Sequence, residues 1–156
     1  MPIESRDIGT LTDAQGRTCC TFAGMKINTL ETWHHIVRSR DATRLDDLLS
    51  PHVVFHSPVV HTAITGKPGT LRYLQAAMQV FYNPSFRYIR EISNAHEAVL
   101  EFEVTLDDTY VNGVDLIRWD HQGRIVDFKV MIRPLKAMQY IHQQMAAMLQ
   151  AKPRSS

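Results

Sequence analysis

The stretch Ala98–Leu106, which reads AVLEFEVTL, decides the fold class because apolar residues alternate in it with polar ones. Every second residue from Leu100 to Leu106 is apolar, whereas Glu101 and Glu103 lie between them. A period of two residues is typical of a β-strand that buries only one of its faces. The stretch therefore predicts one strand of a sheet that covers a core on one side.

Further strands are expected on both sides of this stretch, each bounded by turn residues. Asp107-Asp108 mark a turn directly after it, and Gly123 closes the loop DHQG at 120–123. Glycine is favoured there because it adopts a positive φ at little cost. We expect strands over 86–94, 110–119 and 124–132, so that four strands follow one another through short turns.

Helical periodicity dominates the segments before and after these four strands. We expect a helix from Asn28 or Thr29, a second over 41–49 capped by Asp41 and ended by Pro51, a third over 68–81, and a last one opened by Pro134. A short strand is expected at 53–57. The apolar side of the last helix is expected to hold Leu135, Met138, Ile141, Met145, Met148 and Leu149. Helices kept apart from an antiparallel sheet predict an α+β domain.

Composition restricts the kind of partner. The chain has 156 residues, of which 44% are hydrophobic and 21% charged, and its net charge is +1. These values are typical of one globular domain. Lys and Arg are spread along the chain, so no nucleic-acid partner is expected. No apolar run has the roughly 20 residues that cross a bilayer, so no membrane partner is expected either.

The two ends of the chain lack the periodicity of the rest. We expect an N-terminal extension over 1–24, a single domain over 25–150 and a C-terminal tail over 151–156. Met25 is an alternative natural start, and an arm that packs on a partner subunit is an alternative role for the extension. The first residues carry charge and show no secretory signal. Because Cys19 and Cys20 are adjacent, no disulfide framework is expected, and a reducing cytoplasm is the expected location.

Local motifs resemble the nuclear-transport-factor-2-like superfamily, and within it the SnoaL-like branch of polyketide cyclases and ketosteroid isomerases. They are VVFHSP at 53–58, Gly66 before a helix, and DLIRWDHQGRI at 115–125. The resemblance covers about Thr29 to Met148. It implies a cone, in which a curved antiparallel sheet wraps on helices and encloses an apolar pocket. It also implies a homodimer through the outer face of the sheet, where Glu103 and Arg118 would pair across the interface beside Val99, Glu101, Leu116 and Met131.

The resemblance to ketosteroid isomerase can be followed at three positions. Ser57 precedes Pro58 where that enzyme has its base carboxylate. Trp33 stands at about the position of its tyrosine on the first helix, and an indole offers an N–H but no hydroxyl. Asp115 matches the acid on the third long strand. Because only one of the three positions matches, the usual steroid-isomerase mechanism is not expected.

Asp115 is the candidate catalytic residue. Strand parity places it on one face with Gly113 and Ile117. If that face lines the pocket, desolvation raises the carboxyl pKa above its usual value of ~4. It would then transfer protons on a small hydrophobic carbonyl compound, as in an isomerase, cyclase or dehydratase. The alternatives are that Asp115 only forms hydrogen bonds within the protein, that the pocket binds a hydrophobic metabolite without catalysis, or that the domain binds another protein.

The expected ligand-binding residues surround Asp115 in the cone. They are Trp33, Phe55, Ser57, His61, Met78, Phe102, Ile117 and Phe128. His52 and His56 lie four residues apart, but no further ligand type accompanies them at metal-binding spacing. No metal is therefore expected. The sequence also has no phosphate loop, dinucleotide fingerprint or redox motif, so no cofactor is expected.

Overall fold

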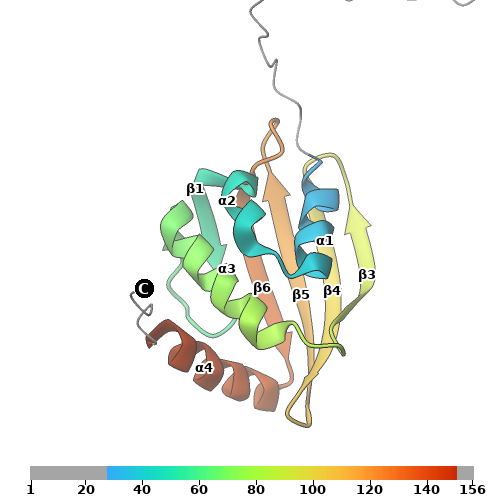
Figure 1. Ribbon diagram of the computed structural model, residues 1–156, viewed down its shortest axis with the longest axis vertical. Coiled ribbons are helices and arrows are strands. Elements are labelled where there is room, and N and C mark those ends of the chain that lie inside the picture. The colour runs from blue at the N-terminus through green and yellow to red at the C-terminus, as the bar shows by residue number, and fades with distance from the viewer. Residues whose placement is uncertain (1–27, 151–156) are drawn as a thin grey trace, which may run out of the picture.

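The computed structural model describes residues 28–150, which form a curved, unclosed sheet of six strands with helices packed on one of its faces (Figure 1). The strand order is β2-β1-β6-β5-β4-β3. Every neighbouring pair is antiparallel except β1 and β6, which are parallel. The elements are α1 (Thr29–Ser39), a 3₁₀ turn (Ala42–Arg44), α2 (Leu45–Leu48), β1 (Leu49–His56), β2 (Ile64–Thr65), α3 (Lys67–Phe81), β3 (Arg87–Ser93), β4 (Glu97–Leu106), β5 (Thr109–Trp119), β6 (Ile125–Arg133) and α4 (Leu135–Gln150). The predicted α+β class is confirmed.

The strand predicted from alternation is β4, and it pairs along its whole length with β5. Its apolar residues Leu100, Phe102 and Val104 are at most 3% exposed, whereas Thr105 faces solvent. Asp107 and Asp108 both have positive φ in the turn between the two strands. The pattern of one buried face is therefore confirmed.

Helical segments begin where the sequence predicted them, near Asn28 and at Asp41. The Asn28 side chain accepts a hydrogen bond from the Glu31 backbone N–H at 3.3 Å and begins α1. The Asp41 side chain accepts one from the Thr43 N–H at 2.9 Å and begins the 3₁₀ turn. These bonds satisfy backbone donors that have no partner inside a helix.

The predicted end of the second helix is wrong. The helix ends at Leu48, and Pro51 lies within β1 and not after a helix. The pairing of β1 with β6 is irregular between Leu49 and Val54. Proline is tolerated at such a bulge because no ladder hydrogen bond needs its missing N–H. The two-residue strand β2 was not predicted, since two residues are too few to show a period.

The predicted apolar side of the last helix is wrong at its first position. Leu135 is 68% exposed, whereas Ala137, Ile141 and Met145 are buried. These three are spaced four apart and define the face of α4 that packs on the domain. Leu135 lies two residues before Ala137, which places it on nearly the opposite side of the helix.

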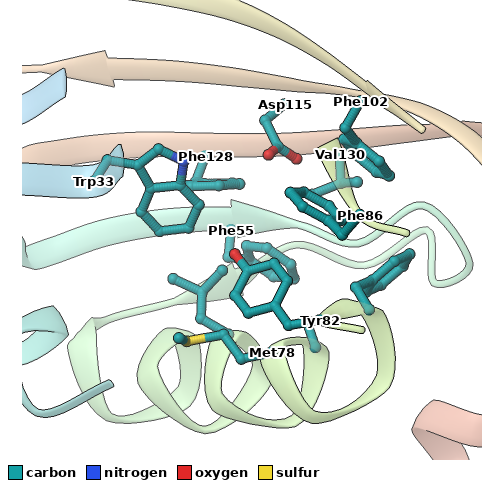
Figure 2. Close-up of a pocket in the computed structure, with 12 residues that line it drawn as sticks. Trp33, Phe55, Met78, Tyr82, Phe86, Phe102, Asp115, Phe128 and Val130 are labelled. Atoms are coloured by element: carbon teal, nitrogen blue, oxygen red, sulfur yellow. The ribbon is translucent and has the colours of Figure 1, made fainter. Parts of the chain in front are cut away.

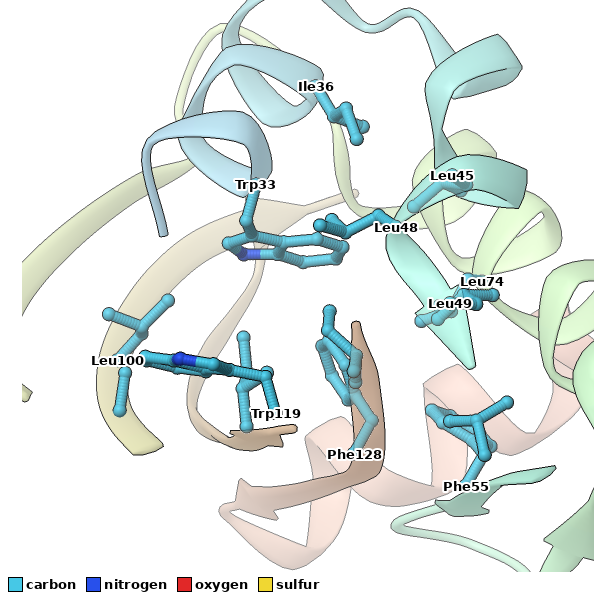
Figure 3. Close-up of a cluster of buried hydrophobic side chains, with 14 of the residues drawn as sticks. Trp33, Ile36, Leu45, Leu48, Leu49, Phe55, Leu74, Leu100, Trp119 and Phe128 are labelled. Atoms are coloured by element: carbon cyan, nitrogen blue, oxygen red, sulfur yellow. The ribbon is translucent and has the colours of Figure 1, made fainter. Parts of the chain in front are cut away.

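The interior consists of two clusters of buried apolar residues. One cluster joins α1, α2 and α3 to the sheet around Trp33 and Phe128, whose ring centroids are 5.0 Å apart, edge to face (Figure 3). The other joins α4 and the end of α3 to the sheet around Phe102 and Phe81. No helix within residues 28–150 is long and apolar enough to cross a membrane. The extension over 1–24 and the tail over 151–156 lie outside the described residues.

Gly113 permits the packing of the ring that links the sheet to the second cluster. It lies opposite Phe102 across the β4–β5 pair. A Cβ atom at Gly113 would lie only 2.7 Å from Phe102 Cε1 and would clash with the Cζ atom as well. The Phe102 ring is itself held by Phe81 and Phe86, with centroids at 5.8 and 5.4 Å. It therefore has little room to move aside.

We predict that Gly113→Ala lowers the free energy of unfolding by about 1–3 kcal/mol, since overpacking a filled core forces side chains off their preferred positions. Denaturant unfolding measures this value. The matched control is Gly113→Ala in a Phe102→Leu background, where the smaller side chain leaves room for the new methyl. If Gly113→Ala costs the same in both backgrounds, the clash with Phe102 is not its cause.

Candidate active site

A small cavity lies where the two apolar clusters meet (Figure 2). The space open to the centres of water molecules is about 50 Å³. That space admits a few waters or a group of a few heavy atoms, since one water needs on the order of 10–15 Å³ of it. The lining residues come from α1, α3, the α3–β3 connection and the sheet: Trp33, Phe55, Leu74, Ala77, Met78, Phe81, Tyr82, Phe86, Phe102, Asp115, Phe128 and Val130.

Among residues 28–150, Asp115 is the one acidic residue that lines this cavity, and it points into the cavity from β5 (Figure 2). Its neighbours across the sheet are Leu100 and Val130, and it is only 6% exposed. The strand parity that the sequence predicted for Asp115 therefore holds. A carboxyl group in such surroundings needs a polar partner, because burying an unpaired charge is costly.

Tyr88 is that partner, and Trp33 supports it, so that two consecutive hydrogen bonds form a relay from Trp33 through Tyr88 to Asp115. The Tyr88 hydroxyl donates to Asp115 Oδ2 at 2.8 Å. The Trp33 indole N–H donates in turn to the Tyr88 oxygen at 2.9 Å. Because Trp33 occupies the acceptor side of Tyr88, the hydroxyl proton is directed at Asp115. The indole of Trp33 thus acts on the carboxyl through a tyrosine and not directly.

Burial raises the pKa of Asp115 to about 7, because apolar surroundings disfavour the charged carboxylate. The hydrogen bond from Tyr88 has the opposite effect and lowers this pKa. Both forms of the carboxyl are therefore populated at neutral pH. This is the condition under which one group both accepts and returns a proton efficiently.

Tyr82 provides a second polar group in the cavity. It caps the end of α3, where its backbone N–H donates to the Met78 carbonyl, and its hydroxyl points into the space between Trp33 and Phe86 (Figure 2). Burial raises the pKa of Tyr82, and the nearby Asp115 raises it further. The hydroxyl has no hydrogen-bond partner within residues 28–150 and stays protonated, so it can donate to a bound molecule.

The structure brings together six of the nine residues singled out from the sequence. Asp115, Trp33, Phe55, Met78, Phe102 and Phe128 line the cavity. Ile117 is buried in the first cluster beside the cavity and not in its lining. The Ser57 hydroxyl accepts a hydrogen bond from the Val59 N–H in the loop after β1. His61 lies exposed in the same loop. Neither loop residue reaches Asp115.

Tyr82 and Tyr88 are the polar residues that sequence reasoning missed. Tyr88 lies opposite Phe102, but the register of β3 shifts between Tyr88 and Arg90, so strand alternation breaks there. Tyr82 follows Met78 by four residues, the spacing of one helix face, but it stands just after the last residue of α3, where the helical pattern ends. The remaining lining residues that were missed are Leu74, Ala77, Phe81, Phe86 and Val130.

No group of three metal-binding side chains occurs within the described residues. His52 is exposed. His56 Nε2 lies 3.2 Å from Asp127 Oδ2, and neither residue lines the cavity.

Comparison with known proteins agrees with this architecture. Residues 30–128 match the SnoaL-like domain family. A steroid delta-isomerase from Pseudomonas aeruginosa is 37% identical, with a TM-score of 0.73 over 78% of this chain and 88% of that one. An uncharacterised protein with a cystatin-like fold from Silicibacter pomeroyi is 31% identical, with a TM-score of 0.71 over 81% and 87% of the two chains. An NTF2-like protein of unknown function from Mesorhizobium loti, 18% identical with a TM-score of 0.59 over 68% and 88%, shares the fold. No curated protein matches the chain.

We predict that Tyr88→Phe raises the pKa of Asp115 above about 7, by on the order of one pH unit, because the lost hydrogen bond favours the charged form. A carbon-13 NMR titration of the Asp115 carboxyl measures this pKa. Tyr110→Phe is the matched control, since the Tyr110 hydroxyl donates to Glu103 on the exposed side of the sheet. An unchanged or lowered pKa in Tyr88→Phe would contradict the relay.

Proposed function

Because the chain belongs to the SnoaL-like domain family, we propose that it is an acid–base enzyme of the isomerase or cyclase kind, in which Asp115 transfers protons on a small hydrophobic carbonyl compound. One observation carries the proposal: a carboxyl group with a pKa of about 7 faces an apolar cavity. The similarity to a steroid delta-isomerase supports the isomerase class. The cavity volume of about 50 Å³ favours a reacting group much smaller than a steroid.

The proton transfer would begin with Asp115 as a base. In a β,γ-unsaturated ketone, the carboxylate takes the proton from the α-carbon, and the electron pair of that C–H bond forms a dienolate. The protonated Asp115 then returns the proton to the γ-carbon, which leaves the double bond conjugated with the carbonyl. A pKa near the working pH suits both halves of this cycle.

Tyr82 would stabilise the charge that develops on the carbonyl oxygen. Its hydroxyl is directed into the cavity, and its raised pKa keeps the proton on the oxygen. A donor that is already oriented in a dry site stabilises an enolate oxygen more than the neutral carbonyl. The proposed division of roles is therefore Asp115 for proton transfer and Tyr82 for hydrogen bonding to the oxygen.

The outer face of the sheet supports a homodimer as part of the proposal. Ile92 and Met131 are 61% and 54% exposed on this face. Ile92 belongs to the lining of a hollow of about 380 Å³, together with Val99 and Leu116. The expected pairing of Glu103 with Arg118 across subunits is not needed, since Glu103 pairs with Arg87 and Arg118 lies 4.0 Å from Asp127 in the same chain. An apolar patch with internally paired charges is suited to contact a second copy.

We predict that Asp115→Asn lowers the rate of conversion of cyclohex-3-enone to cyclohex-2-enone by about 10²–10⁴-fold, the usual contribution of a general base. The absorbance of the conjugated product measures the rate. In the unaltered protein kcat/KM should rise with pH and level off above about 7, because only the ionised Asp115 accepts a proton. Asp127→Asn, which removes an acid outside the cavity, is the control. A flat profile, or an active Asp115→Asn variant, would rule out the base.

A non-catalytic binder is the second candidate. Ser57, which stands where ketosteroid isomerase has its base carboxylate, lies outside the cavity, and within residues 28–150 no second acid lines the cavity beside Asp115. NMR titration with cyclohex-2-enone separates the two functions. If the unaltered protein and Asp115→Asn bind this ketone equally and neither converts cyclohex-3-enone, the chain binds without catalysis.

We predict that Leu116→Asp with Met131→Glu makes the protein a monomer, because each places a charge in the proposed contact. Light scattering after gel filtration gives the mass. Leu135→Glu, at another exposed apolar position, should leave the dimer intact. A monomeric unaltered protein would refute the interface.

A further inference from the structure

A second hollow lies directly outside the cavity, between the end of α1 and the connection from α3 to β3. Its volume is about 230 Å³, several times that of the cavity. Tyr82 and Phe86 belong to the lining of both spaces. The two spaces are therefore neighbours that share one aromatic wall.

This wall consists of two rings in contact. The ring centroids of Tyr82 and Phe86 are 4.9 Å apart, edge to face, and Figure 2 shows both at the edge of the cavity. Tyr82 follows the last residue of α3, and Phe86 precedes the first residue of β3. Both rings thus stand on a connection and not inside a regular element. A molecule longer than the cavity would have to part these two rings to place its other end in the outer hollow.

The outer hollow is basic. Arg38, Arg40, Arg87 and His34 line it, and no acidic residue of the described chain does. Arg87 pairs with Glu103, and His34 Nε2 lies 2.6 Å from Glu91 Oε2. Arg38 and Arg40 form no ion pair within residues 28–150 and are both exposed. The guanidinium groups of Arg38 and Arg40 therefore remain available to an anion in the outer hollow.

We propose that the substrate is an amphipathic anion, a short apolar carbonyl compound whose carboxylate binds Arg38 and Arg40 in the outer hollow. This inference rests on the proposed function, since the carbonyl end would lie beside Asp115. Guanidinium groups suit a carboxylate because their N–H donors match its two oxygens. The opposite orientation is disfavoured, since a buried carboxylate beside Asp115 would be both desolvated and repelled. Charge at one end and apolar surface at the other would thus fix the direction of binding.

The test compares hexan-2-one with 5-oxohexanoate, which present the same methyl ketone without and with a terminal carboxylate. NMR titration follows the indole N–H of Trp33, which lines the cavity. The indole of Trp119, bonded to the Ala95 carbonyl, is the internal reference. We expect 5-oxohexanoate to bind about tenfold more tightly at low salt, with the advantage shrinking as salt screens the charges.

Arg38→Gln with Arg40→Gln should abolish this advantage and leave the affinity for hexan-2-one unchanged. Arg124→Gln, which removes an exposed arginine in the β5–β6 loop that does not line the outer hollow, should preserve the advantage of 5-oxohexanoate. If hexan-2-one binds but the carboxylate adds nothing, or if its advantage survives in Arg38→Gln with Arg40→Gln, this inference fails and the proposed function stands. If neither compound perturbs Trp33, both fail.

Discussion

The interaction on which the site depends is the hydrogen-bonded relay from Trp33 through Tyr88 to Asp115. It joins α1, β3 and β5, three elements far apart in the sequence, at a carboxyl group that is almost wholly buried. Without a donor, that carboxyl would be very costly to bury. The relay supplies one charge-assisted hydrogen bond and leaves the second carboxylate oxygen to the cavity. The fold can therefore hold an acid in an apolar interior and still present it to a bound molecule.

The aromatic residues around the relay depend on a backbone constraint in the neighbouring pair of strands. The outer end of the Phe102 ring lies against Gly113 because the glycine has no Cβ atom, and Phe86 stacks on the same ring. Asp115 is two residues from Gly113 on the same face of β5. Gly113, which makes room for the Phe102 ring, and Asp115, which carries the carboxyl group, thus face the same side because they alternate with outward-facing residues along β5. A change in the register of β4 and β5 would move both to the outer face at once.

Periodicity predicted those parts of the site that lie inside regular elements. The alternation of β4 placed Phe102, the parity of β5 placed Asp115, and the helical spacing of α3 placed Met78. It did not place residues whose direction depends on an irregular backbone. Tyr88 precedes a register shift in β3, and Tyr82 stands at the end of a helix. Ser57 and His61, which were expected to contact a ligand, lie in a loop whose path no local pattern determines. The irregular pairing of β1 is a further example, since it accommodates Pro51 within a strand where the sequence predicted the end of a helix. The resemblance placed a single tyrosine on the first helix, where this chain has Trp33, whereas the fold supplies Tyr82 and Tyr88 from other positions.

The number of hydrogen-bond donors around the carboxyl group distinguishes Asp41 from Asp115. Asp41 accepts from both the backbone N–H and the hydroxyl of Thr43, and these bonds lower its pKa while it caps the 3₁₀ turn. Within the described part of the chain Asp115 has a single donor and is buried, and its pKa moves in the opposite direction. A carboxylate kept only for stability would be expected to collect further donors, since each one offsets part of the desolvation cost. Asp115 has one hydrogen-bond donor, and the Tyr82 hydroxyl that lines the same cavity has no partner within residues 28–150. Both observations favour an Asp115 carboxyl group that receives its remaining partner from a bound molecule.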